Sequence, residues 1–296
     1  MPTPILEDTF AEAFPMTGTR LLITAIDREL AEQAAREFCG NASSVIGCDA
    51  ECGIEGWLEA SETPDGRPGV SVLVFAFSRS ALEQAVASRI GQNVLTCPTT
   101  ACFSGLPVTD KSKQLKLGAL LRYFGDGFQI SKKLDRRRIW RVPVMDGEFV
   151  CDDVAGTVKG VGGGNLIVTA STQLECLTAV RKAVAAIRKV RNVILPFPTG
   201  IVRSGSKVGS KYKQLKASTN DEWCPTLVGQ TKSKLVEGEN AVYEIVIDGL
   251  SEQDVANAMK VGIQALLENS DATRVSAGNY GGKLGPFHFR LRDLAE

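Results

Sequence analysis

Two stretches of the chain repeat one pattern of predicted strand and helix, and this duplication limits the possible folds more than any other feature. Leu21–Ala25 and Leu166–Ala170 are short apolar segments of similar sequence. Each precedes a run of apolar residues at helical spacing, which predicts helices over residues 28–39 and 173–189. The repeat therefore indicates two copies of one architecture rather than a single mixed fold.

A second strand and helix follow in each copy, after a long loop. Residues 70–92 and 242–264 have equal length, and each joins an alternating apolar strand to an amphipathic helical pattern. A Ser or Thr three positions ahead of an acidic residue predicts a capped helix start at Thr172/Glu175, Ser80/Glu83 and Ser251/Asp254. Further short strands are expected at residues 44–48, 192–196, 94–96 and 274–277.

Each half thus has the order strand, helix, strand, loop, strand, helix, strand. That order predicts a ferredoxin-like α/β sandwich, an antiparallel sheet with two helices on one face. The fold class is α+β, with two such lobes from an internal duplication. We expect the boundary after the strand Arg138–Met145, which gives an N-terminal lobe of residues 1–146 and a C-terminal lobe of residues 147–296.

The composition excludes several classes of protein. Lys plus Arg and Asp plus Glu both number 34, so no overall charge favours nucleic acid. The start of the chain lacks the pattern of a signal peptide, and the longest apolar runs are too short to span a bilayer. We therefore expect a cytoplasmic protein. Its eight cysteines include no C-x-x-C pair, which favours reduced thiols over a metal site or a disulfide framework.

The chain has one histidine, which restricts its possible chemistry. A catalytic triad or a multi-histidine metal centre would have to use His288. This residue lies in the alternating segment Phe287–Arg292, a pattern that favours a strand residue over a catalytic base. Chemistry is therefore expected from carboxylates, amides, hydroxyls and lysine.

Polar, glycine-rich segments gather in the second half of the chain. Pro196–Gly209, Ala217–Asp221 and Ser276–Gly285 have little apolar periodicity and supply hydrogen-bond donors beside flexible backbone. They predict a binding site, although each alone could be an ordinary surface loop. One basic cluster lies in and after the first of these segments and could receive anionic coenzyme tails; it comprises Arg203, Lys207, Lys211, Lys213 and Lys216. A second basic cluster is either a solvated face or a protein contact, and it comprises Lys132, Lys133, Arg136, Arg137, Arg138 and Arg141.

Glu244 is the strongest candidate for chemistry. It lies in the strand Ala241–Ile247, which is apolar on both faces, so its carboxyl should be desolvated and its pKa raised. The internal repeat places Val72 at the equivalent position, so the fold does not require a carboxylate there. The competing interpretation is a glutamate at a sheet edge or in a salt bridge.

Several long segments resemble formylmethanofuran:tetrahydromethanopterin formyltransferases, in order along the whole chain. The resemblance implies two related α/β lobes, no prosthetic group and homo-oligomers built as dimers of dimers. It also implies that both coenzymes bind together and that the formyl group passes directly between them. The segments that carry it are Glu7–Phe14, Ser61–Gly69, Pro196–Val202, Ser204–Gly209, Ala217–Asp221, Ala241–Ile247 and Ser276–Gly285.

Glu244 matches the proposed catalytic glutamate of this family, and the glycine-rich segments match its coenzyme site. The candidate binding residues are Pro196, Phe197, Pro198, Gly200, Ser204, Gly205, Ser206, Lys207, Ser218, Thr219, Asn220, Asp221, Asn279, Tyr280, Gly281, Gly282 and Lys283. No tightly bound cofactor or metal is expected; a methanofuran-type coenzyme and tetrahydromethanopterin are the substrates.

Three positions depart from the archaeal pattern of the family. Asp49, Thr199 and Arg203 differ from what archaeal members tend to have, and the chain is neutral rather than acidic. These differences resemble the bacterial, methylotrophic branch, in which the protein is a subunit of a formyltransferase/hydrolase complex. That branch implies a different furan coenzyme and a reaction that runs toward the formylated furan.

The expected mechanism uses Glu244 in its protonated form, to donate a hydrogen bond or a proton as charge develops on the formyl oxygen. One alternative is covalent transfer through Cys97 or Cys102, although no histidine lies near either in sequence. The other is a non-catalytic subunit that binds coenzyme or organises a complex.

Overall fold

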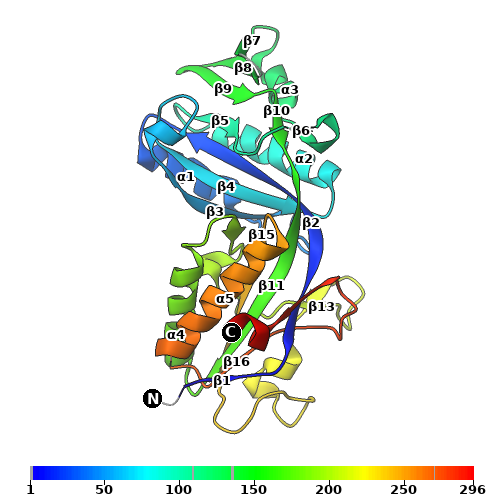
Figure 1. Ribbon diagram of the computed structural model, residues 1–296. Helices are drawn as coiled ribbons and strands as arrows, with labels where there is room; N and C mark the ends of the chain where they lie inside the picture. Colours follow the sequence, from blue (N-terminus) through cyan, green and yellow to red (C-terminus); the bar gives the residue numbers. More distant parts are fainter. Residues whose placement is uncertain (1–2, 109, 135–136, 270) are drawn as a thin grey trace. The chain divides into compact units, whose positions relative to one another are not determined.

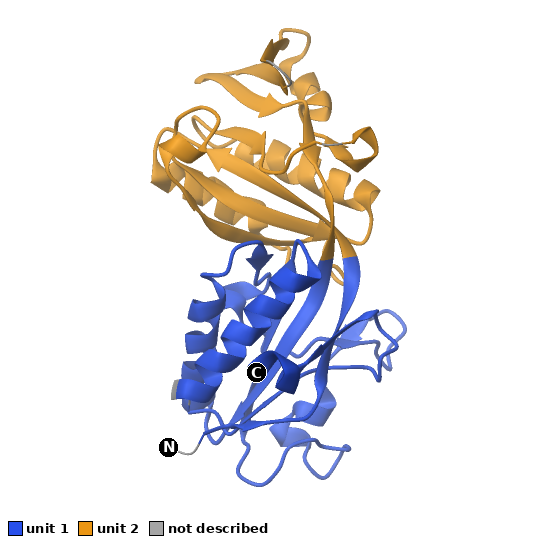
Figure 2. Ribbon diagram, in the orientation of Figure 1, with its two compact units in different colours: residues 1–15, 161–296 blue, residues 16–160 orange. Residues whose placement is uncertain are grey.

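The computed structural model describes residues 3–108, 110–134, 137–269 and 271–296, and its chain forms two compact units (Figure 2). One unit comprises residues 16–160; the other comprises residues 1–15 together with residues 161–296. The lobe boundary expected after residue 146 falls in the turn between strands β8 (Arg137–Val144) and β9 (Gly147–Asp152). As a division into lobes it stays a prediction.

The unit of residues 16–160 is built on a four-stranded antiparallel sheet. Its strands are β2 (Phe10–Thr24, which begins in the other unit), β3 (Glu51–Leu58), β4 (Gly69–Ala76) and β5 (Ala101–Ser104). Their spatial order is β3-β4-β2-β5. The second, third, first and fourth strands of the copy are therefore neighbours in that order, as a ferredoxin-like sandwich requires.

Helices α1 (Arg28–Cys39) and α2 (Arg79–Arg89) pack on this sheet (Figure 1). The side chain of Asp27 caps α1 by accepting the N–H of Leu30. Burying Phe38 contributes roughly 1.5–3 kcal/mol to folding, and the three buried alanines beside it allow the helix to pack closely on the sheet. The buried face of α1 comprises Ala31, Ala34, Ala35 and Phe38.

Shorter elements extend the sheet at the β5 side. Strand β9 pairs in parallel with β5, and β8 joins β9 to β7 (Ile130–Leu134) through antiparallel pairing. The basic cluster of residues 132–141 therefore lies on the antiparallel pair β7 and β8, although Arg136 lies outside the described residues. The remaining elements are β6 (Gln114–Lys116), which pairs with β10 (Val154–Gly156), and α3 (Gly118–Leu121).

The other unit repeats the same strand order. Its strands are β11 (Val158–Ala170, which begins in the first unit), β12 (Val193–Ile194), β15 (Ala241–Gly249) and β16 (Arg274–Ser276). They follow the order β16-β11-β15-β12, again with antiparallel neighbours. Because both copies have this strand order, the predicted duplication and the ferredoxin-like fold class are confirmed.

Helices α4 (Gln173–Ile187) and α5 (Glu252–Asn269) lie side by side against this second sheet (Figure 1). Thr172 caps α4 as predicted, because its hydroxyl oxygen accepts the N–H of Glu175. The unit also contains β1 (Ile5–Leu6), β13 (Lys207–Val208), β14 (Ala217–Ser218), β17 (Phe287–Arg290) and α6 (Leu291–Ala295).

The prediction of a strand at residues 44–48 is wrong. These residues form a turn, in which the N–H of Cys48 donates to the carbonyl of Ser44. The carboxylate of Glu51 also accepts the N–H of Val45. These local bonds satisfy the backbone without a partner strand, and pairing begins only at Glu51 in β3.

Other predicted boundaries also differ. The strand expected at residues 94–96 is wrong, because the helical path continues there through the π-helix Ile90–Val94 and pairing resumes in β5. Helix α2 starts two residues early, with Ser78 rather than Ser80 as its cap. The alternating segment that starts at Phe287 stops being a strand after Arg290, where α6 begins.

No helix among the described residues is long and apolar enough to cross a membrane. All eight cysteines carry free thiols.

Candidate active site

Glu244 lies in the middle of β15, with backbone partners on both sides. It is opposite Ile167 of β11, and on its other side its N–H and carbonyl exchange hydrogen bonds with Val202, at 3.1 and 2.7 Å. Its side chain is 5% exposed. Glu244 is therefore not at a free sheet edge, and its carboxyl is held away from bulk water.

The Glu244 carboxyl has one hydrogen-bond partner in the described part of the chain. Its Oε1 accepts the hydroxyl of Ser206 at 2.7 Å, whereas Oε2 is buried without a partner, and no ion pair of the described residues includes it. Burial raises the pKa of Glu244 to about 7, and the hydrogen bond from Ser206 partly opposes this rise. The side chain can therefore hold and release a proton near neutral pH.

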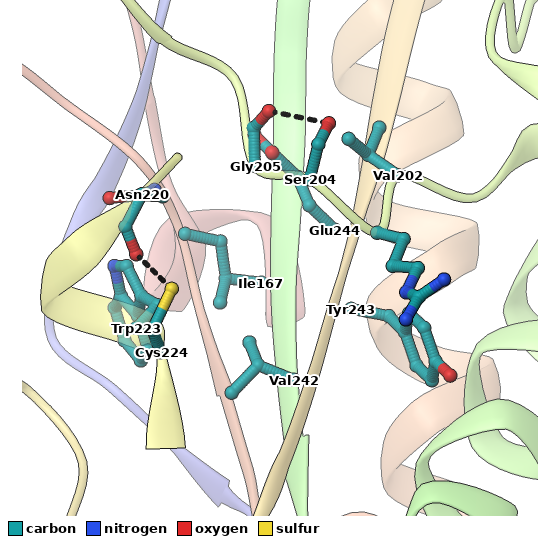
Figure 3. Close-up of a pocket in the computed structure, with 11 residues that line it drawn as sticks. Ile167, Val202, Ser204, Gly205, Asn220, Trp223, Cys224, Val242, Tyr243 and Glu244 are labelled. Atoms are coloured by element: carbon teal, nitrogen blue, oxygen red, sulfur yellow. Dashed lines mark hydrogen bonds between the residues drawn. The ribbon is translucent and has the colours of Figure 1, made fainter. Parts of the chain in front are cut away.

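A small pocket opens beside this carboxyl (Figure 3). Figure 3 shows Glu244 directed toward Ser204 and Gly205, with Trp223 and Cys224 together on the other side of the pocket. The pocket suits the reacting end of a ligand more than a whole large coenzyme. Its lining residues are Ile167, Val202, Arg203, Ser204, Gly205, Asn220, Trp223, Cys224, Val242, Tyr243 and Glu244.

Gly205 brings two of the predicted segments into contact. Its φ of +73° lies in the left-handed region, and a Cβ at this position would be 2.4 Å from the Cβ of Asn220. Only glycine therefore allows the segment around Ser204 to approach Asn220 this closely, and this approach forms one wall of the pocket.

Charge and backbone pairing hold these two segments together. Lys207 forms an ion pair with Asp221, and it also pairs through its backbone with Ser218 across β13 and β14. The hydrogen bond to Asp221 raises the pKa of Lys207, and the same bond lowers the pKa of Asp221. Because both side chains remain partly exposed, the pair orients the loop more than it stabilises the fold.

Tyr280 joins the third predicted segment to the first. Its hydroxyl oxygen accepts the N–H of Val208 at 2.7 Å, and its O–H lies 3.4 Å from the carbonyl of Ser206. Burial raises the pKa of the Tyr280 hydroxyl. The three polar segments predicted from the sequence thus contact one another beside the pocket that contains Glu244.

Two halves of the chain match models of a single family. Residues 3–144 match the family described as formylmethanofuran-tetrahydromethanopterin formyltransferase, and residues 147–294 match the model of its proximal lobe. The chain belongs to this family.

Relatives of the family align with the chain over almost its whole length. The formylmethanofuran–tetrahydromethanopterin formyltransferase of Methylococcus capsulatus is 54% identical over 98% of this chain and 97% of its own. The solved formyltransferase/hydrolase complex of Methylorubrum extorquens with methylofuran contains a chain 48% identical, with a TM-score of 0.93 over 98% of this chain and 96% of that one. The solved formyltransferase of Methanosarcina barkeri is 46% identical, with a TM-score of 0.91 over 98% of each.

The structure gathers some of the residues predicted for the formyltransferase site and places others outside the pocket. Ser204, Gly205, Asn220 and Glu244 line it. In contact with those loops, but not in the lining, are Ser206, Lys207, Ser218, Asp221 and Tyr280. Thr219 is also outside the lining, but its hydroxyl lies 3.3 Å from the Sγ of the lining residue Cys224. Away from the lining are Pro196, Phe197, Pro198, Gly200, Asn279, Gly281, Gly282 and Lys283.

Some of these outer residues have evident structural contacts. Gly200 has a φ of +82°, and a Cβ there would press on Leu195. The amide of Asn279 donates to the carbonyl of Phe10 at 3.1 Å. His288, in strand β17 as predicted, is exposed and lies 3.1 Å from the carbonyl of Gly285. Whether any of these positions contacts a coenzyme stays a prediction.

Three lining residues lie outside the segments that the sequence predicted for the site. Ile167 reaches the pocket from β11, Trp223 reaches it from the short helical turn Asp221–Trp223, and Cys224 directly follows that turn. Trp223 is buried, and the guanidinium of Arg274 stacks 5.2 Å from its ring. The sequence signal for Trp223 was a single tryptophan inside a polar loop. A large apolar side chain in such a loop indicates that the loop packs against the rest of the protein.

Within the residues that the structure covers, no group of three or more His, Cys, Asp and Glu side chains could hold a metal ion. The chemistry proposed below uses the carboxyl of Glu244 and the polar groups around it.

Replacing Ser206 with alanine is expected to raise the pKa of Glu244 further above about 7. The hydroxyl of Ser206 donates to Oε1, and this bond favours the ionised carboxylate, so its loss leaves burial unopposed. Infrared titration of the buried carboxyl band, assigned by its absence in Glu244→Gln, checks the shift. A midpoint that stays in place or moves to lower pH would show that Ser206 does not control this carboxyl.

Proposed function

We propose that the chain transfers a formyl group between a methanofuran-type coenzyme and N5 of tetrahydromethanopterin, with both coenzymes bound at the same time. Membership of the formyltransferase family supports the reaction. The observation that carries the mechanism is the buried Glu244 side chain, which lines the pocket and whose Oε2 has no partner in the described structure. This oxygen is the group best placed to act on the reacting atoms.

The acceptor amine attacks the formyl carbon, and a C–N bond forms while negative charge develops on the formyl oxygen. Protonated Glu244 donates from Oε2 to that oxygen and stabilises the tetrahedral intermediate. When the original C–N bond breaks, the leaving nitrogen takes a proton and the formyl C=O forms again. A carboxyl with a pKa of about 7 can give this proton and recover one from the attacking amine.

The loops around Glu244 hold the reacting ends of the coenzymes in contact, which supplies much of the rate acceleration. Ser204 and Asn220 offer hydrogen-bond donors at the pocket wall. Arg203, which is exposed at the pocket, and Lys207 are available to anionic parts of the coenzymes. The segments predicted from the sequence therefore act as a binding frame around one acid–base group.

The chain works in the cytoplasm, as a homo-oligomer arranged as a dimer of dimers, and as one subunit of a formyltransferase/hydrolase complex. Support for the complex comes from the solved formyltransferase/hydrolase complex of Methylorubrum extorquens, which contains a chain 48% identical to this one. In such a complex the formyl group moves from tetrahydromethanopterin to the furan coenzyme, for hydrolysis by partner subunits.

Direct transfer is favoured over a covalent route through cysteine. Cys102 is fully buried, and burial raises the pKa of its thiol well above the usual range; burial also raises the pKa of Cys97. Both lie in the unit of residues 16–160, whereas Glu244 lies in the other. The thiol at the pocket is that of Cys224, so it is the cysteine that a test has to include.

Thiol alkylation of the purified chain tests direct transfer. Transfer by Cys224→Ser, before and after alkylation, should equal transfer by the untreated wild type. A loss of transfer in Cys224→Ser, or a formyl group recovered on a cysteine after rapid quenching, would instead indicate a thioester intermediate.

A further inference from the structure

Glu12 is a buried carboxylate that is satisfied by the backbone of one distant loop. It lies in β2 and is 2% exposed. Its Oε2 accepts the N–H groups of Tyr280 and Gly282, at 2.7 and 3.0 Å. Its Oε1 accepts those of Leu284 and Gly285, the latter at 2.9 Å. No ion pair of the described residues includes Glu12. The negative charge of its carboxylate is therefore stabilised by these four N–H groups.

The loop is folded around this carboxylate. Gly281 and Gly282 have φ values of +68° and +77°, which turn nearby N–H groups toward one point and form an anion-binding nest. A Cβ on Gly285 would lie 2.2 Å from the carbonyl oxygen of Ala13, so the end of the loop is also fitted to β2. Burial acts to raise the pKa of Glu12, but the four N–H groups outweigh it and lower the pKa overall.

A continuous set of hydrogen bonds leads from Glu12 to Glu244. Glu12 fixes the backbone of Tyr280, and the Tyr280 hydroxyl contacts the N–H of Val208 and the carbonyl of Ser206. The hydroxyl of Ser206 donates to Glu244 at 2.7 Å. Every residue of this set lies in the same compact unit. The carboxylate of Glu12 thus sets the position of the segment that contacts the acid–base group.

We propose that Glu12 is a positioning residue for formyl transfer: it holds Tyr280 against the segment 206–208 and thereby fixes the hydrogen bond between Ser206 and Glu244. This inference rests on the proposed function. Glu12 does not touch the reacting atoms, and its effect on the reaction passes through Tyr280.

A double-mutant cycle with Glu12→Gln and Tyr280→Phe tests this role. Glutamine has the size of glutamate, but its amide NH₂ faces two N–H donors where the carboxylate had an acceptor, so the loop has to shift. We expect each single variant to lower kcat/KM on the order of tenfold. Because both act through one contact, the double variant should fall little further than either single variant. Glu12→Asp, which keeps both acceptor oxygens, should recover part of the activity.

Glu51→Gln is the matched control. Glu51 is also a buried carboxylate that accepts a backbone N–H, from Val45 at 2.9 Å, but it lies in the unit without Glu244. Its variant should lose stability and keep kcat/KM. If Glu12→Gln behaves in the same way, or if the losses of the two single variants multiply, Glu12 is only a structural residue.

Amide hydrogen exchange provides a readout that does not depend on activity. In Glu12→Gln, exchange should accelerate at residues 280–285 and also at Val208, whose N–H is held by Tyr280. In Glu51→Gln, amide exchange should accelerate neither at residues 280–285 nor at Val208. If the wild type transfers no formyl group, the proposed function fails while this measurement still reports on Glu12. Acceleration confined to residues 280–285 would overturn the link to the site.

Discussion

Glu244→Gln is expected to lower the rate of formyl transfer by about 10²–10⁴-fold. Glutamine fills the same space and can still donate a hydrogen bond, but it cannot give a proton to the leaving nitrogen or recover one from the attacking amine. The buried Oε2 of Glu244, which lacks a partner among the described residues, makes it the proton donor that the pocket offers. The measurement is single-turnover transfer at saturating concentrations of both coenzymes.

The variant should fold normally and bind both coenzymes with affinities close to those of the wild type. Calorimetric titration of each coenzyme checks binding, and Glu51→Gln controls for the loss of a buried carboxylate elsewhere in the chain. A rate within a few-fold of the wild type would contradict proton transfer by Glu244 and leave it at most a hydrogen-bond donor. Lost binding would instead place Glu244 in coenzyme recognition.

Glu244 is also expected to make the wild type lose stability as pH rises, relative to Glu244→Gln. Its pKa in the folded chain is about 7, above the ordinary value of 4.5. A raised pKa means that the folded state binds the proton more tightly, so the stabilisation is complete below pH 4.5 and is lost as pH rises toward and through 7. At 1.36 kcal/mol for each pKa unit, the loss is about 3 kcal/mol.

Urea unfolding of both proteins between pH 4 and pH 9 measures this difference. The free energy of unfolding of the wild type should fall relative to the variant from about pH 4.5 to pH 7 and then run parallel to it. Other titrating groups affect both proteins alike and cancel in the comparison. If the free energies of unfolding of the two proteins stay parallel from pH 4 to pH 9, the pKa of Glu244 is the same in the folded and unfolded chains, which would contradict the prediction.

The duplicated fold could be predicted because its signal is local. Helices α1 and α4 were found from apolar spacing, and the repeated order of elements indicated the ferredoxin-like topology. The failures were at short apolar runs, where helix, strand and turn look alike. Residues 44–48 form a turn because side chains such as Glu51 satisfy its backbone, and residues 94–96 follow a π-helix instead of starting a strand.

The candidate site was only partly predictable, because several of its contacts join loops and residues that are far apart in the sequence. Glu244 was identified from a comparison of the two copies that set Val72 opposite it. That equivalence is wrong by one residue: Leu22 pairs with Ser71 where its counterpart Ile167 pairs with Glu244, so Ser71 is the equivalent residue, and it is not an acid either. Trp223 and Cys224 were missed because their contacts are made by a loop without periodicity. The role of Glu12 could not be seen in the sequence at all, since its four partners lie 268 to 273 residues further along the chain.

The most direct test follows a labelled formyl carbon from formyl-tetrahydromethanopterin to a methanofuran-type acceptor in the presence of the purified chain alone. The label should appear on the acceptor with the wild type, and the Glu244→Gln variant should transfer almost none in the same time. No transfer by a folded wild type that binds both coenzymes would contradict the proposed function and favour a non-catalytic subunit that binds coenzyme or organises a complex.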